Sequence, residues 1–241
     1  MSSEQTMQSI EKHIRNNFDD RAALETALAN TIVAQLSEAI KTDGKASIAV
    51  SGGSTPKALF AALSLADIDW SKVDVTLVDE RWVDTSSEQS NERMLRECFA
   101  INYAAKANII GMKSADDDVA YGVENYNHKL ANVIKQPFDV VILGMGGDGH
   151  TASWFPDAPE IDNALDPAAS SLTLSTLPPS QPMPRITISY PCVAAAKNIY
   201  LHITGDDKRQ VLEYGLDGTK ALPIHRTLSQ LEQAVNIYWA N

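Results

Sequence analysis

The sequence has only two cysteines, Cys98 and Cys192, in 241 residues. Two thiols cannot supply the disulfide framework of a small secreted domain, and they favour a reducing compartment. No apolar run approaches the length of about 18 residues that indicates a transmembrane helix. The first residues also lack the apolar stretch of a secretion signal. We therefore expect a cytoplasmic protein that does not bind membranes.

Basic residues are scarce as well. Lys and Arg number 20 against 31 Asp and Glu, which gives a formal charge of −11. Such a chain repels nucleic acids and anionic membrane surfaces, so neither is an expected partner. An anionic metabolite would need a local cluster of cations, which makes each Arg or Lys near a glycine loop informative. The hydrophobic content of 44% is enough for one sizeable core, and we expect a single domain over residues 1–241.

Helix-like and strand-like patterns alternate along the chain. They predict helices over residues 20–41, 91–99, 119–134 and 207–214, and strands over residues 46–50, 73–78, 107–110, 140–143, 185–190 and 199–203. Residues 237–239 suggest an edge strand, and residues 222–225 suggest a turn. The alternation predicts an α/β fold, a mostly parallel, Rossmann-like sheet with helices on both faces. The proline-rich residues 157–184 predict a small additional region of loops with one strand-like piece, 171–177.

The most informative stretch follows the strand at 140–143. Four glycines, Gly144, Gly146, Gly147 and Gly149, surround Asp148 and lead directly into His150. Glycine lets the backbone approach a ligand closely and takes positive φ without strain. Open α/β sheets bind ligands at the carboxyl ends of their strands. We therefore predict that His150, expected at the start of a helix, performs proton chemistry on a small anionic substrate.

Two other interpretations of this loop compete with that one. Gly144-x-Gly146-x-x-Gly149 also matches the dinucleotide fingerprint, but that motif needs a long helix and a second strand. Pro156 and Pro159 would stop such a helix after barely two turns. The other alternative is that His150 only caps a helix. The glycine density beside it favours a functional role, whereas His13, His128, His202 and His225 lack a supporting group of residues.

Three further motifs follow predicted strands. Ser51-Gly52-Gly53-Ser54-Thr55-Pro56 indicates a strand-to-helix turn whose free amides suit a phosphate, although an ordinary capped turn has similar letters. Asp79-Glu80-Arg81 places three charges at a strand end, for substrate or for an internal ion pair. Lys208 falls in a first helical turn, against the helix dipole, which suggests a ligand or an ion pair. Strand ends share one edge of a parallel sheet, so we expect these loops to converge.

Taken together, SGGSTP, DERWV followed by Asn91, GMGGDGHTASWFP, PRITISYP and GDDKRQVL resemble the 6-phosphogluconolactonase family, which shares a superfamily with the glucosamine-6-phosphate deaminase/isomerases. The resemblance spans nearly the whole chain in family order. It implies hydrolysis of 6-phospho-D-glucono-1,5-lactone in the oxidative pentose phosphate pathway, in the cytoplasm, without a metal or cofactor. It implies that His150 is the base and that the phosphate is held by Ser51, Gly52, Gly53, Ser54, Arg81, Arg185 and Lys208. Trp154 and Asp157 depart from the family pattern, which affects the pocket wall more than the chemistry.

The residues suggest a mechanism. A neutral imidazole accepts a proton from water near neutral pH, because the reference pKa of histidine is about 6.5. Asp148 is a candidate to orient His150, and Asp79 to contact the substrate. The first rival is an amino-sugar phosphate deaminase or isomerase, but the resemblance to deaminases calls for a glutamate soon after the histidine, and residues 151–156 contain no acid. The second is a non-catalytic sugar-phosphate-binding module. The pattern leaves a monomer and a homodimer equally open.

Overall fold

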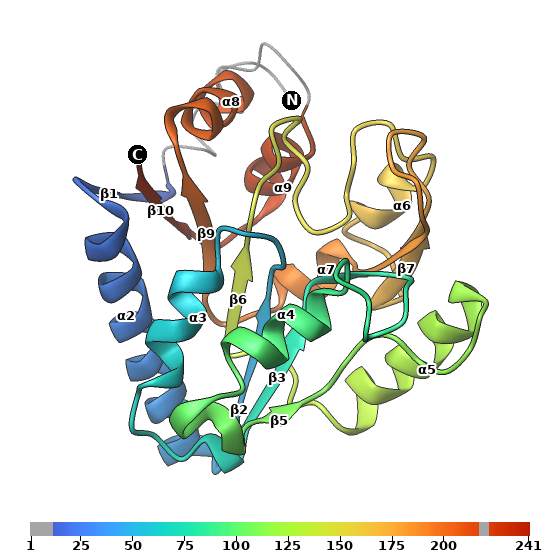
Figure 1. Cartoon of the computed structure of the whole chain (residues 1–241). Coiled ribbons are helices and arrows are strands. Elements are labelled where there is room, and N and C mark those ends of the chain that lie inside the picture. Colours follow the sequence, from blue (N-terminus) through green and yellow to red (C-terminus); the bar gives the residue numbers. More distant parts are fainter. Residues whose placement is uncertain (1–11, 217–221) are drawn as a thin grey trace.

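The computed structural model describes residues 12–216 and 222–241. In that part of the chain, seven parallel strands form a sheet in the order β1-β10-β9-β6-β2-β3-β5 (Figure 1). Their bounds are β1 Ile14–Phe18, β2 Ala46–Val50, β3 Val73–Leu77, β5 Asn108–Ile109, β6 Val140–Leu143, β9 Ile199–Thr204 and β10 Val235–Ala240. Every residue of β2, β3 and β6 is buried, which explains the nearly continuous apolar sequences of β2 and β6.

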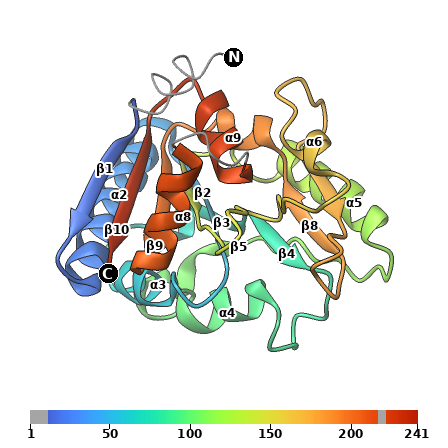
Figure 2. The same cartoon turned by 90° about the horizontal axis from the view of Figure 1, so that it is seen from above.

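Helices cover both faces of this sheet (Figures 1 and 2). The described helices are α2 Arg21–Asp43, α3 Lys57–Ser64, α4 Asn91–Cys98, α5 Val119–Asn132, α6 Ile161–Ala164, α7 Tyr190–Ala194, α8 Asp206–Leu216 and α9 Pro223–Gln230, with 3₁₀ turns at Trp70–Lys72 and Asn102–Lys106; of these, α5 packs on strands β7 (Thr173–Thr176) and β8 (Arg185–Ile188) of a second, smaller sheet. The longest, α2, begins where Asp20 accepts a hydrogen bond from the Ala23 amide and ends at Gly44 with φ 74°. Both devices are typical helix ends. Among the described helices, none has the length and apolar character needed to span a membrane.

A second, antiparallel sheet lies beside the strand ends, in the order β4-β8-β7. It consists of β4 Asp79–Arg81, β7 Thr173–Thr176 and β8 Arg185–Ile188. Its register pairs Arg81 with Arg185, which come from motifs that are about a hundred residues apart in the sequence. The predicted α/β class, with a mostly parallel sheet and a small additional strand region, is therefore confirmed.

Several local expectations were wrong. Strand β1 was not predicted, because Ile14–Phe18 reads IRNNF and lacks a strand pattern. Strand β10 lies between β1 and β9, so residues 237–239 are not at the sheet edge. The expected turn at 222–225 instead starts α9, where Pro223 occupies a first-turn position that suits its fixed φ. The pairing of β1 with β10 joins segments from opposite ends of the chain, so no local sequence pattern predicts it.

No helix follows His150. Thr151 and Trp154 form an isolated bridge instead, and Ala152 has a φ of 48°, which is not a right-handed helical conformation. The next helix begins at Ile161. The dinucleotide interpretation of the glycine loop needs a long helix directly after it, so the structure rules against that interpretation. The idea that His150 caps a helix fails for the same reason.

Candidate active site

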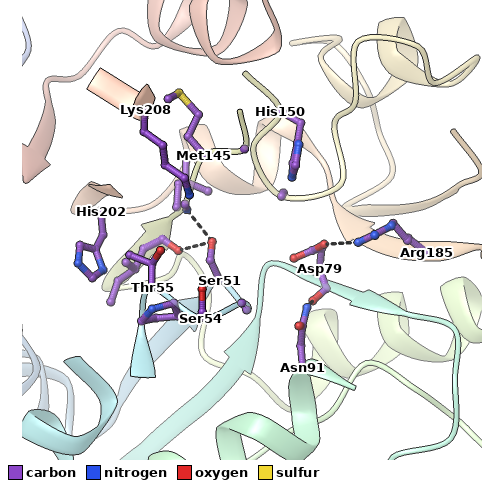
Figure 3. A pocket seen from close by; sticks show the side chains of 18 of the residues that line it. Ser51, Ser54, Thr55, Asp79, Asn91, Met145, His150, Arg185, His202 and Lys208 are labelled. Atoms are coloured by element: carbon purple, nitrogen blue, oxygen red, sulfur yellow. Dashed lines mark hydrogen bonds and ion pairs between the residues drawn. The ribbon is translucent and has the colours of Figure 1, made fainter. Parts of the chain in front are cut away.

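A pocket of about 250 Å³ opens at the carboxyl ends of β2, β6 and β9 (Figure 3). It is lined by Ser51, Gly52, Gly53, Ser54, Thr55, Pro56, Asp79, Arg81, Asn91, Ile142, Leu143, Gly144, Met145, Gly146, His150, Ala152, Arg185, His202 and Lys208. The four sequence motifs therefore converge on one cavity. Parallel strands produce this result, since their carboxyl ends lie at one edge of the sheet.

The loop after β6 folds back on itself to present His150. The Gly146 amide donates to the His150 carbonyl at 2.9 Å, and the Gly149 amide donates to the Gly146 carbonyl at 3.1 Å. Gly149 has a φ of 77°, which favours glycine. A Cβ on Gly146 would lie 2.1 Å from Cε1 of His150. Glycine at position 146 is therefore what leaves room for the imidazole.

Asp148 holds the imidazole of His150. Its Oδ1 lies 2.5 Å from Nδ1 of His150 and also accepts a hydrogen bond from the His150 amide at 3.1 Å. Partial burial disfavours the charged carboxylate, but the contacts with His150 outweigh this, so the pKa of Asp148 is lowered. The ring of His150 stacks on Phe155, with centroids 4.0 Å apart. With Nδ1 engaged, Nε2 is the nitrogen available for chemistry.

The Ser51–Pro56 turn forms the wall at the end of β2. Ser51 ties it to the histidine loop, since its Oγ accepts from the Gly144 amide at 2.7 Å and donates to the Ile142 carbonyl at 3.1 Å. Among the described residues, the amides of Gly52, Gly53 and Ser54 have no acceptor. A Cβ on Gly52 would collide with Asn91, so this backbone needs glycine. Free amides in such a turn form an anion-binding site.

Lys208 reaches the pocket from the first turn of α8. Figure 3 shows its side chain pointing toward the Ser51 turn. Partial burial lowers the pKa of Lys208, and no carboxylate in the described part of the chain lies within ion-pair distance of it. A partly buried ammonium without an acidic partner would be stabilised by a bound anion, so this position suits an anionic ligand.

Two arginines line the opposite side of the pocket. Nη1 of Arg185 lies 3.6 Å from Oδ2 of Asp79, and its Nη2 donates to Oε1 of Gln181 at 2.7 Å. Nη1 of Arg81 donates to the Gln89 carbonyl at 2.7 Å. Asp79 also accepts from Ser153 Oγ at 2.6 Å. The acid–arginine pair at this strand end is thus Asp79 with Arg185, and the cations stand on two sides of the cavity.

Glu80 has a structural role. It is fully buried, and its carboxylate accepts hydrogen bonds from the Arg81, Asn91 and Glu92 amides and from Ser90 Oγ, at 2.7 to 3.0 Å. Burial dominates these contacts and raises the pKa of Glu80. The side chain fixes the start of α4 against β4 and does not line the pocket.

Sequence reasoning assigned no site role to several pocket side chains, among them Asn91, Met145 and His202. Asn91 donates from Nδ2 to the Asp79 carbonyl at 3.0 Å, and Met145 covers the cavity next to Lys208 (Figure 3). His202, expected to lack supporting residues, lines the pocket and lies 3.2 Å from Glu25. The available signal was its place near the carboxyl end of a strand. Asp148, the candidate to orient His150, contacts its Nδ1 and is not among the residues that line the pocket.

In the described residues, no group of three or more His, Cys, Asp or Glu side chains is arranged to hold a metal ion.

Comparisons with known proteins agree with one another. A family model described as glucosamine-6-phosphate isomerases/6-phosphogluconolactonase matches residues 19–239. A 6-phosphogluconolactonase of Rhizobium meliloti (strain 1021) is 39% identical over 225 residues, covering 92% of this chain and 97% of that protein. One of Pseudomonas aeruginosa is 36% identical, covering 88% of each. The crystal structure of a 6-phosphogluconolactonase from Shewanella baltica OS155 superposes with a TM-score of 0.91 at 42% identity, covering 96% of this chain and 99% of that one.

The match over nearly the full length, together with glycine turns, a histidine and a lysine that meet in one pocket, leads to a single assignment. This chain belongs to the glucosamine-6-phosphate isomerase/6-phosphogluconolactonase family.

Proposed function

We propose that this chain hydrolyses 6-phospho-D-glucono-1,5-lactone to 6-phospho-D-gluconate, the second step of the oxidative pentose phosphate pathway. One observation carries the proposal. His150, held by Asp148, lines the same pocket as the unpaired amides of the Ser51 turn and Lys208. A base on one side and an anion site on the other match a substrate with a carbonyl and a phosphate at its two ends.

The phosphate binds at the Ser51 turn. Gly52, Gly53 and Ser54 offer amides without an acceptor, and Lys208 adds an ammonium without an acidic partner among the described residues. Backbone donors at the start of a helix and a lysine point charge are a common combination for phosphate. Arg81 and Arg185 contact the substrate from the opposite wall. Asp79 accepts from a sugar hydroxyl, and it already offsets part of the charge of Arg185.

His150 acts as general base. Its Nε2 removes a proton from a water molecule, and that water attacks the lactone carbonyl. The proton moves to Nε2, the carbonyl oxygen gains the negative charge, and ring opening releases the alkoxide, which takes the proton back. Asp148 holds Nδ1–H and stabilises the imidazolium. The amides of Gly144 and Gly146 are already engaged, whereas those of Met145 and Gly147 have no acceptor among the described residues and are the loop donors that can stabilise the oxyanion.

This mechanism uses no metal or cofactor, because a lactone carbonyl is electrophilic enough for an activated water. We place the reaction in the cytoplasm, since Cys98 and Cys192 are both free thiols. Both a monomer and a homodimer are compatible with this proposal.

The assay is direct. Freshly prepared 6-phosphogluconolactone is followed by acid release, and the spontaneous rate is subtracted. We expect hydrolysis that saturates with substrate and that falls about 10²- to 10⁴-fold in His150→Ala, the usual range for a general base. Full activity in that variant would end the assignment of His150 as base.

The family description also covers glucosamine-6-phosphate isomerases, so that activity needs its own test. Residues 151–156 contain no acid to assist sugar-ring opening, and we expect no ammonia release from glucosamine 6-phosphate. Release of ammonia would favour the deaminase, and tight binding of 6-phosphogluconate without turnover would favour a non-catalytic binding module.

A further inference from the structure

The turn that carries His150 is closed on itself. The Gly146 amide donates to the His150 carbonyl at 2.9 Å, and the Gly149 amide donates to the Gly146 carbonyl at 3.1 Å. Oδ1 of Asp148 contacts both Nδ1 and the amide of His150. These contacts hold the shape of the turn, but they do not fix its place relative to the rest of the molecule. Another segment has to do so if the base is to keep its position.

The start of α9 makes that contact. In the described part of the chain, the only hydrogen bond that joins this turn to another segment runs from the Ile224 amide to the Gly149 carbonyl, at 2.9 Å. Leu222, the residue before α9, packs on the same glycine, since a Cβ added to Gly149 would lie 2.9 Å from both Cβ and Cδ1 of Leu222. The turn is therefore supported from outside at the residue next to His150.

Helix α9 is itself anchored in the core. Ile224 and Leu228 are fully buried, and Nε2 of His13 lies 3.0 Å from the Leu228 carbonyl. The helix also packs against α8, whose first turn carries Lys208 (Figure 2). The start of α9 is thus a fixed support for the turn, and one packed pair of helices contacts both the base and the phosphate end of the pocket.

We propose that Leu222 is a positioning residue for His150, and that its side chain, with the neighbouring Ile224 amide, holds the turn so that Nε2 reaches the substrate. This inference rests on the proposed function, because it concerns the base of the same reaction. Leu222 is not among the described residues that line the pocket, so it acts through the turn and not by touching the substrate. A displacement of about 1 Å in a reacting group can cost about 10²-fold in rate.

The test compares three variants with wild type. Leu222→Ala removes the atoms beyond Cβ that pack on Gly149, and Leu222→Met restores a side chain of similar volume. Leu174→Ala is the matched control, because Leu174 is also a partly buried leucine packed on the core but lies on β7, outside the pocket. We measure kcat and KM on 6-phosphogluconolactone and the Kd of 6-phosphogluconate by calorimetry. Thermal melting verifies that each variant folds.

We expect kcat to fall about 10- to 100-fold in Leu222→Ala, with KM and Kd unchanged because the groups that hold the substrate stay in place. Leu222→Met should regain most of the lost kcat, and Leu174→Ala should keep the wild-type value. A loss confined to kcat marks an interaction that matters in the chemical step and not in binding. If Leu222→Ala does not fold, Leu222→Val, which removes a single methylene, should show a smaller fall with the same split between kcat and KM.

A second measurement follows the imidazole itself. The ring of His150 stacks on Phe155 with centroids 4.0 Å apart, so the ring current of the phenyl group makes the Cε1–H resonance of His150 sensitive to small displacements. Nuclear magnetic resonance identifies this signal by its absence in His150→Gln. The resonance should shift in Leu222→Ala and stay unchanged in Leu174→Ala.

Wild-type kcat in folded Leu222→Ala, or an equal fall in Leu174→Ala, would overturn the inference. So would a rise in KM and Kd that accounts for the whole loss, since that result would assign Leu222 to binding. If wild type does not hydrolyse the lactone, the proposed function fails. The resonance of His150 then still decides whether Leu222 positions the ring, and an unchanged resonance in Leu222→Ala would refute it.

Discussion

The contact between Asp148 and His150 permits a sharp test, the substitution Asp148→Asn. Asparagine is nearly isosteric, and its Oδ1 still accepts from both the His150 amide and Nδ1, at present distances of 3.1 and 2.5 Å. The turn and the orientation of the ring are thus preserved, and only the negative charge is lost. The variant isolates electrostatic stabilisation of the imidazolium from positioning of the base.

The size of the effect follows from the exposure of the pair. A charge pair at about 4 Å is worth roughly 1 kcal/mol in water and roughly 4 kcal/mol near a protein surface of lower effective dielectric. The side chains of His150 and Asp148 are 29% and 41% exposed, so the lower half of that range applies. A loss of about 1–2 kcal/mol of transition-state stabilisation corresponds to roughly a 5- to 30-fold fall in kcat.

The assay measures kcat on 6-phosphogluconolactone across pH 5.5–8, the variants beside wild type. Because the pKa of Asp148 is lowered from an already acidic value, its charge is present throughout this range, and the loss of kcat should appear at every pH in it. Asp157→Asn is a matched control, since Asp157 is exposed and lies outside the pocket, and Ser180 is its only hydrogen-bond partner among the described residues. Unchanged kcat and profile would refute a role for the charge of Asp148. A loss as large as that of His150→Ala would show that Asp148 does more than stabilise the ring.

Three other changes test separate parts of the site. Lys208→Met should raise the Kd for 6-phosphogluconate about 10- to 100-fold with a smaller change in kcat. Because burial lowers the pKa of Lys208, the affinity of wild type should begin to decline, as the pH is raised, at a pH lower than lysine's ordinary pKa of about 10.4. Gly146→Ala forces a Cβ to within 2.1 Å of the His150 ring, whereas Gly147→Ala meets nothing within 4 Å; a kcat loss of about 10²-fold is expected only in the first, and equal activities would contradict the packing argument. Glu80→Gln replaces one carboxylate oxygen, which accepts hydrogen bonds from backbone amides, with an NH₂ group that cannot accept them. The free energy of unfolding, followed by thermal melting, should fall by about 2–4 kcal/mol, and the folded enzyme should keep its specific activity. Unchanged stability would mean that the start of α4 does not depend on the carboxylate.

The chemistry-bearing segments were accessible to sequence analysis because each is local. Asp148 and His150 are two residues apart in one glycine loop, so their contact depends on a single turn. The convergence of the loops also follows from pattern alone, since buried apolar strands alternating with helices imply a parallel sheet with one active edge. The fold class and the family followed from these features.

Only the tertiary structure determined which partner each charged side chain contacts. Asp79 pairs with Arg185, and Glu80 serves the start of α4; adjacent carboxylates on one strand point to opposite sides, so the letters alone cannot assign their partners. His202 lines the pocket and lies 3.2 Å from Glu25, which is 177 positions away on another element. In the same way, β10 became an inner strand because β1, from the other end of the chain, pairs with it. Such partnerships depend on which elements pack together, which is a property of the whole core and not of any local run of residues.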